Sequence, residues 1–168
     1  IDAQLQRALE LSDSEEETYE VAARALGALL GEARAELLLA DASHAHLRRV
    51  ASNPHAPAPG CSVESPSACA AVRRGKTMDF DTVDGLDACL KLRREGVCGA
   101  VCSPVSVLGH TVGVIHAVRD GDNVVGSDAI HALRLVSAHL GTRLGILRTL
   151  NTTRRQAERD ALTGLLNR

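Results

Sequence analysis

Five cysteines are the side chains of this 168-residue chain best suited to chemistry: Cys61, Cys69, Cys89, Cys98 and Cys102. Thiolates ligate metal ions and take part in redox exchange, so this group predicts a metal or redox site. The alternative is that the thiols pack as small hydrophobic side chains, as free cysteines commonly do. We favour packing, because the chain has one phenylalanine, one tyrosine and no tryptophan with which to fill a core.

The surroundings of two cysteines nevertheless predict reactive thiols. Cys69 falls in the first turn of an expected helix with Arg73 one turn later, and Cys89 has the same spacing to Arg93. Helix amide dipoles and a nearby arginine both lower the pKa of a thiol. We therefore expect lowered pKa values for these two groups.

The remaining candidates lie in expected strands. Cys98 and Cys102 have the same strand parity and should face one side, but in an extended chain they lie roughly 13 Å apart. That separation excludes a disulfide between them, and the chain has no C-x-x-C pair. His116 shares a strand face with Val112 and Val114 and is a candidate pocket residue, although a lone histidine on an apolar strand is more often a hydrogen-bonded core residue.

Hydrophobic periodicity and capping residues define the elements that must position these side chains. A helix is expected over residues 2–11, and a second from the capping box Ser14-Glu15-Glu16-Glu17 to Gly31. Strands are expected over 35–40, 46–52 and 77–80. Short helices are expected from Ser65 to about Arg74 and from Asp84 past Leu90. They are followed by a hairpin of strands 99–108 and 111–119 that turns at Gly109-His110, and then by a long helix from Ser127. This order predicts an α+β fold: a mainly antiparallel central sheet, with N- and C-terminal helices packed on one face and short helices and loops on the other.

Composition narrows the class of protein. The net charge of −2 and the two aromatic residues exclude the usual physical basis for nucleic-acid binding. No apolar run in this stretch is long enough to cross a bilayer. Cysteines without a dense disulfide framework favour reduced thiols and a cytoplasmic location. The sequence requires no cofactor, and a metal or small organic ligand is left open.

The long last helix has a pattern suited to pairing. Leu133, Leu140, Leu144 and Leu147 follow spacings of seven, four and three, and the same register continues to Asn151. Such a seam is typical of a parallel helix pair, in which a polar residue like Asn151 fixes the register at a cost in stability. The alternative is that these leucines pack on the domain's own sheet or opening helix. Both can hold on different faces of the helix, because further apolar surface is supplied by Ile130, Leu135, Ile146 and Leu150.

The last nine residues, Asp160-Ala161-Leu162-Thr163-Gly164-Leu165-Leu166-Asn167-Arg168, match the pattern D-x-L-T-G-L-x-N-R. This segment resembles the start of GGDEF domains, with Asp160, Leu162, Thr163, Gly164, Leu165, Asn167 and Arg168 at the fixed positions. The resemblance implies a parent diguanylate cyclase, which makes cyclic di-GMP from two GTP molecules. The G-G-D-E-F motif would lie after Arg168, so no catalysis is expected from residues 1–168.

Residues from about Glu15 to Leu150 resemble a GAF domain, chiefly through the element order and the segments 99–105 and 109–117. The resemblance implies an incoming helix or linker over 1–13, a sensor domain over 14–150, and over 151–168 a signalling helix and the start of a truncated GGDEF domain. It also implies a ligand pocket between the sheet and the crossover that follows the second strand.

Together these features predict a regulatory sensor and homodimerisation module that controls a covalently linked diguanylate cyclase domain through its last helix. A small-molecule ligand is expected in the pocket. One alternative is a cysteine-based redox or metal sensor. Another is an enzyme similar to GAF-fold free methionine sulfoxide reductases, which use a cysteine nucleophile.

Overall fold

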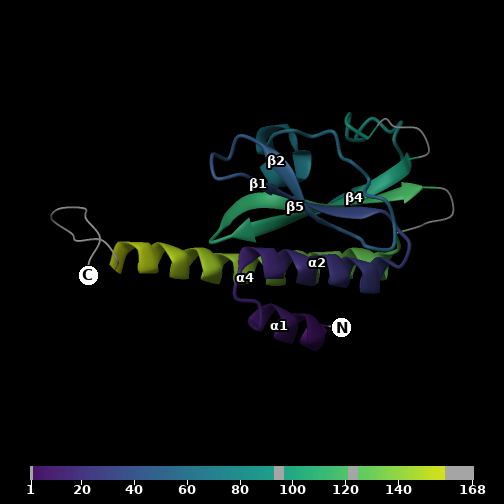
Figure 1. The fold of residues 1–168 in the computed structure, drawn as a ribbon. Helices are drawn as coiled ribbons and strands as arrows, with labels where there is room; N and C mark the ends of the chain where they lie inside the picture. The colour runs from purple at the N-terminus through teal and green to yellow at the C-terminus, as the bar shows by residue number, and fades with distance from the viewer. Residues whose placement is uncertain (1, 93–96, 121–124, 158–168) are drawn as a thin grey trace.

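The computed structural model describes residues 2–92, 97–120 and 125–157 (Figure 1). Helices are α1 (Asp2–Glu10), α2 (Glu15–Leu30), α3 (Ala70–Arg74) and α4 (Ser127–Ala157), with a 3₁₀ turn η1 (Pro66–Ala68). Strands are β1 (Ala35–Ala40), β2 (Leu47–Ser52), β3 (Met78–Phe80), β4 (Val97–Val107) and β5 (His110–Asp120). They form one antiparallel sheet in the order β2-β1-β5-β4-β3.

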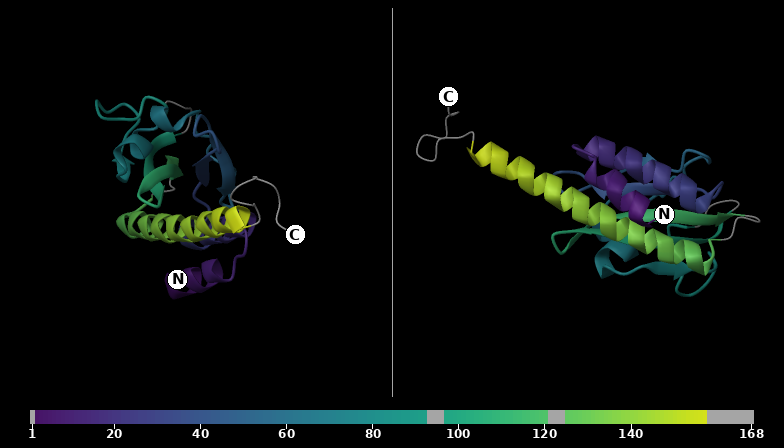
Figure 2. Two further views of the ribbon diagram at one scale, coloured as in Figure 1. Left: turned by 90° about the vertical axis from the view of Figure 1, so that its left-hand side faces the viewer. Right: turned by 90° about the horizontal axis from the view of Figure 1, so that it is seen from below.

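The sheet separates two layers of different character. Helices α2 and α4 lie side by side on one face, and α1 lies across them on the side away from the sheet (Figures 1 and 2). Helix α3, η1 and the long connections cover the opposite face. The predicted α+β architecture is therefore confirmed.

Local signals set the limits of α2. Ser14 caps the helix, because its Oγ accepts a hydrogen bond from the Glu17 amide at 3.1 Å. The Glu17 carboxylate accepts a bond of 2.6 Å from the amide of Asp13, one residue before the cap. At the other end Gly31 has φ +56°, a backbone conformation that glycine adopts without strain. The helix bounds predicted from these residues are confirmed.

Alternation along the central strands divides the apolar side chains between two cores. Ile115 and Ala117 of β5 pack toward the helices, in a core that also contains Leu26 of α2. Val114 and Val118, the alternate residues, pack toward the crossover. The second core contains the only phenylalanine, Phe80, together with Cys69, Cys102 and small aliphatic side chains.

Two bulges in the β4–β5 ladder change which way side chains face. Val97 pairs with Asp120 while Gly99 pairs with Arg119, so Cys98 is an extra residue in β4; likewise Val112 is extra in β5. An unpaired residue reverses the parity of the strand beyond it. The prediction that Cys98 and Cys102 face one side is therefore wrong: Cys98 is exposed and Cys102 is buried.

Three further expectations differ from the structure. Val112 packs in the core next to the helices, opposite to Val114, because of the second bulge. The hairpin turns one residue earlier than predicted, at Leu108 and Gly109, whose φ values of +50° and +82° fit a type I′ turn. Residues 84–90 form turns and bends in place of the predicted short helix.

Helix α4 is fixed tightly to β4. Leu133, Leu140, Leu144 and Leu147 are buried in the core of their own chain, so the predicted pairing seam is wrong and the alternative of packing within the domain is confirmed. At Gly141 the helix approaches β4 so closely that a Cβ atom would overlap the Ser106 carbonyl oxygen. Beyond this crossing α4 runs past the edge of the sheet (Figure 1), and residues 149–156 are all exposed.

Within the described part of the chain no helix combines the length and apolar character needed to span a membrane.

Candidate functional site

A row of polar side chains crosses the sheet on the face that the crossover covers. Glu36 of β1 is paired with His116 of β5, and His116 is paired with Cys102 of β4. Direct partners in neighbouring strands have their side chains on the same face. A carboxylate, an imidazole and a thiol therefore stand next to one another, with exposed fractions of 1%, 2% and 8%.

Each member of this row has a specific partner. The Cys102 Sγ and His116 Nδ1 atoms are joined by a hydrogen bond of 3.4 Å. Glu36 Oε1 accepts a bond of 2.6 Å from the Cys61 amide, and Glu36 Oε2 lies 3.6 Å from Arg49 Nη1. The carboxylate thus ties the crossover to β1, because Cys61 belongs to the loop above the sheet. These hydrogen bonds and the ion pair offset the free-energy cost of removing the polar side chains from water.

Sequence reasoning missed Glu36. The signal was present, since one acidic residue interrupts the apolar run Ala35-Glu36-Leu37-Leu38-Leu39-Ala40. A charged residue in the middle of a strand that is buried on both faces needs a partner, and the partner here comes from a distant loop.

Cys102 belongs to this row, and three of the other four cysteines lie in or against the same core. Cys69 and Cys102 are buried in the second core, and Cys61 and Cys89 are half-buried against it, whereas Cys98 is outside. Burial raises the pKa of Cys61 to about 11, and burial also raises the pKa of Cys69 and of Cys102. The lowered pKa expected for Cys69 is wrong, because loss of hydration outweighs the amide hydrogen bonds at its helix start.

At neutral pH these three thiols are protonated, which makes them poor nucleophiles and poor targets for oxidation in this state. Among the described residues, no three histidine, cysteine, aspartate or glutamate side chains are placed to hold one metal ion. The row is thus a closed polar network in an apolar core.

A second polar contact joins α2 to α4. Arg148 donates two hydrogen bonds to Glu15, from Nε to Oε1 at 3.0 Å and from Nη2 to Oε2 at 2.9 Å. The Tyr19 hydroxyl donates a bond of 2.7 Å to Glu15 Oε2. The hydrogen bond from Arg148 lowers the pKa of Glu15, while burial is the main cause that raises the pKa of Tyr19. Asn151, one turn beyond Arg148, is exposed and lines the same surface hollow as Tyr19.

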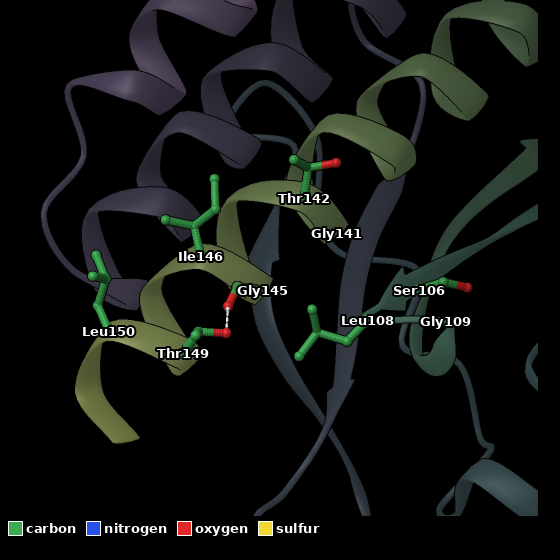
Figure 3. A pocket seen from close by; sticks show the side chains of 9 residues that line it. All are labelled: Ser106, Leu108, Gly109, Gly141, Thr142, Gly145, Ile146, Thr149 and Leu150. Atoms are coloured by element: carbon green, nitrogen blue, oxygen red, sulfur yellow. Dashed lines mark hydrogen bonds between the residues drawn. The ribbon is translucent and has the colours of Figure 1, made fainter. Parts of the chain in front are cut away.

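On another side of α4, a groove of about 530 Å³ separates the helix from the β4–β5 turn (Figure 3). Leu108 projects from the turn toward Gly145, and Ile146 and Leu150 stand on the helix side of the groove. All three of these large apolar side chains are exposed, Leu108 at 74%. The residues of the GGDEF-like motif, 160–168, lie outside the described residues.

No protein-family model and no curated protein matches the sequence. Solved structures do match the fold, among them residues 122 to 287 of a methyl-accepting chemotaxis protein, at 17% identity, 88% of this chain, 98% of that chain and a TM-score of 0.71. A free methionine-R-sulfoxide reductase from Neisseria meningitidis matches at 16% identity, 89% of each chain and a TM-score of 0.71. The GAF domain of an Acinetobacter phosphoenolpyruvate-protein phosphotransferase matches at 14% identity, 90% of this chain, 92% of that chain and a TM-score of 0.69. At these identities the similarity shows a GAF-like fold.

Proposed function

We propose that this GAF-like domain is a regulatory sensor that dimerises through α4 and controls a diguanylate cyclase domain that follows it. The observation that carries the proposal is that α4 leaves the domain as a helix with residues 149–156 all exposed. The GGDEF-like pattern over 160–168 supports the identity of the output domain.

The exposed side of α4 supplies a pairing surface different from the one first predicted. We call it the outer stripe: Leu135, Thr142, Ile146, Thr149 and Thr153, all exposed. Their spacings of seven, four, three and four follow the heptad pattern of a coiled coil. Leu150 stands beside the stripe and adds apolar area.

The threonines of the outer stripe suit burial better than their hydroxyl groups suggest. Thr142, Thr149 and Thr153 each donate a hydrogen bond of 2.9 to 3.0 Å to the carbonyl four residues earlier. A hydroxyl satisfied inside its own helix loses little when water is removed. A second helix can therefore cover this surface without leaving unpaired donors.

The protruding part of α4 gains little stability from its own domain, because residues 149–156 are all exposed. Three threonines among residues 149–153 are poor helix formers, so helix propensity also contributes little there. A second copy of α4, packed along the outer stripe, is the occupant that supplies the missing contacts.

Dimerisation explains how such a domain would regulate its output. Two GTP-bound cyclase domains must meet to make one product, so a helix pair that sets their separation or rotation gates the reaction. Arg148 and Glu15 transmit movements of the sensor to α4, because they join the two helices near the place where α4 leaves the domain.

The oligomeric state tests the proposal with one matched pair of variants. Ile146→Asp places a charge in the outer stripe and should convert a dimer into a monomer in sedimentation analysis, with little loss of folding stability. Asn151→Asp places the same charge on the opposite side of α4 and should leave the dimer intact. In the full-length protein, Ile146→Asp should also lower cyclic di-GMP synthesis at least tenfold. A dimer that tolerates Ile146→Asp but not Asn151→Asp would restore the register first predicted.

A second candidate function is a cysteine-based redox or metal sensor. Cys61, Cys69 and Cys89 lie in or against the same core as the hydrogen-bonded Cys102–His116 pair, which supports it, whereas the raised pKa values of three of these thiols argue against it. Anaerobic purification followed by a count of free thiols and of bound metal tests it: five free thiols with no metal would argue against it. The thiol–imidazole pair also supports testing for reduction of free methionine sulfoxide, which requires turnover with a thiol reductant.

A further inference from the structure

We propose that a hollow between the β1–β2 turn and the β4–β5 turn binds a small molecule with more than one phosphate group. The hollow has a volume of about 670 Å³, and its charged and titratable lining residues are His44, Arg73, His110 and Arg148. They come from four different elements: the β1–β2 turn, α3, β5 and α4.

The charged side chains that line this hollow are all positive. None of the described residues that line it is acidic. Within residues 2–92, 97–120 and 125–157, no carboxylate pairs with Arg73, His44 or His110, and all three are exposed. Arg148, the other arginine of the hollow, binds Glu15. Arg73 and Arg148 are therefore the fixed positive charges of the hollow, and Glu15 is not among its lining residues.

The chemistry of the lining points to phosphate. Guanidinium groups bind phosphate oxygens with paired, charge-assisted hydrogen bonds, and imidazoles add donors. A volume of about 670 Å³ lies within the usual range for small-molecule sites and exceeds the needs of one phosphate. A diphosphate, free or as part of a nucleotide, would use both arginines together.

Both turns beside this hollow contain a residue with left-handed backbone. His44 and Leu108 have φ values of +54° and +50°, the only positive values among the described non-glycine residues, and both line the hollow. At Leu108 this conformation belongs to the type I′ turn of the β4–β5 hairpin, which fixes the position of that wall.

The position of Arg148 connects this hollow to the output helix, an extension that rests on the proposed function. Arg148 lines the hollow and also holds Glu15, so an anion bound there competes with Glu15 for the same guanidinium. Weakening that contact changes how α4 is held against α2. Tyr19 reports the change, because its hydroxyl donates to the same carboxylate.

Tyr19 is an intrinsic fluorescent probe for the competition between a bound anion and Glu15. Tyr19 is the single tyrosine and there is no tryptophan, so tyrosine emission comes from one site. A hydrogen bond to a carboxylate quenches tyrosine emission, and the emission should therefore change when Arg148 moves away from Glu15. Inorganic pyrophosphate and GTP are the probes, each compared with sodium chloride at equal ionic strength.

We expect pyrophosphate to raise the melting temperature and to alter Tyr19 emission. Both effects should saturate over the same range of pyrophosphate concentration. Arg73→Ala should weaken the affinity about tenfold, the loss of one charge-assisted contact. Arg74→Ala is the matched control: Arg74 is the next residue of α3, also exposed, and does not line the hollow. If GTP binds more tightly than pyrophosphate, the natural ligand is a nucleotide; equal affinities assign it to the free phosphate class.

Three results would overturn the proposal. Responses that sodium chloride reproduces, or that Arg73→Ala and Arg74→Ala weaken equally, would show charge screening and no site. Binding without any change in Tyr19 emission would overturn the coupling to α4. These readouts come from the folded domain, so they do not depend on whether the outer stripe pairs two chains or on the identity of the output domain.

Discussion

Arg148 and Glu15 form a two-point contact, in which two nitrogens of one guanidinium meet the two oxygens of one carboxylate at 3.0 and 2.9 Å. Such paired contacts fix orientation as well as distance. Here they fix α4 relative to the first turn of α2. The side chains are 32% and 25% exposed, so water screens the pair only in part.

Removing this contact should destabilise the fold measurably. We expect Glu15→Ala to lower the free energy of unfolding by about 1 kcal/mol, because the pair is bidentate and only partly screened. Glu16→Ala is the control, since Glu16 also lies in the first turn of α2 but is exposed; its effect should stay within about 0.5 kcal/mol. Urea denaturation of both variants measures the difference, and equal effects would show that the helix dipole accounts for both.

The same contact should make stability depend on pH. The hydrogen bond from Arg148 holds the pKa of Glu15 below its ordinary value of 4.5. A depressed pKa in the folded state stabilises the protein above the unfolded pKa, and this stabilisation is lost as the pH falls through the folded pKa. The stability advantage of the native protein over Glu15→Gln should therefore be full at neutral pH and shrink below about pH 4.5. An advantage that is constant from pH 7 to pH 3 would contradict this.

Two glycines of α4 should respond to the same substitution in opposite ways. Gly141→Ala should lower stability by about 2 kcal/mol or more, because its Cβ would overlap the Ser106 carbonyl oxygen and force α4 away from β4. At Gly145 the nearest atoms to an added Cβ are 3.6 Å away, so Gly145→Ala should raise stability by up to about 1 kcal/mol through helix propensity. Thermal melts distinguish them, and destabilisation by both variants would show that the crossing is looser than described.

The five thiols should react in an order set by burial. Cys98 is exposed and should react first with an aromatic disulfide reagent at pH 8. Cys69 and Cys102 should react only when the protein unfolds, because they are buried and burial raises their pKa values. Cys98→Ser should remove the fast phase. Rapid reaction of all five thiols in the folded protein would revive the redox interpretation of the whole group.

Periodic and capping signals predicted most of the fold. The stripe of α2, its cap at Ser14 and its stop at Gly31 are local, so the sequence alone determines them. The sheet and its layers followed from the order of the elements. The bulges at Cys98 and Val112 were not predictable in this way, because an extra residue in a ladder depends on the partner strand and leaves the alternation of the sequence unchanged.

The candidate site was harder to predict than the fold. Cys102 and His116 were identified as candidates, but their contact depends on the register between β4 and β5. Glu36 was missed because its partner, the Cys61 amide, is distant in sequence. The leucines of α4 illustrate a general ambiguity, because a heptad spacing is the same whether the helix packs on another chain or on its own sheet. Here Leu140 and Leu144 are fully buried within their own domain.

The close crossing of α4 over β4 gives the helix the mechanics of a lever. Gly141 and Ser106 act as the fulcrum, since the two backbones meet there with no side chain between them. From Gly141 to Ala157 the helix extends about 24 Å. A tilt of about 5° at the fulcrum would displace the far end by about 2 Å, so a shift too small to rearrange the cores becomes a movement that the proposed output domain could detect.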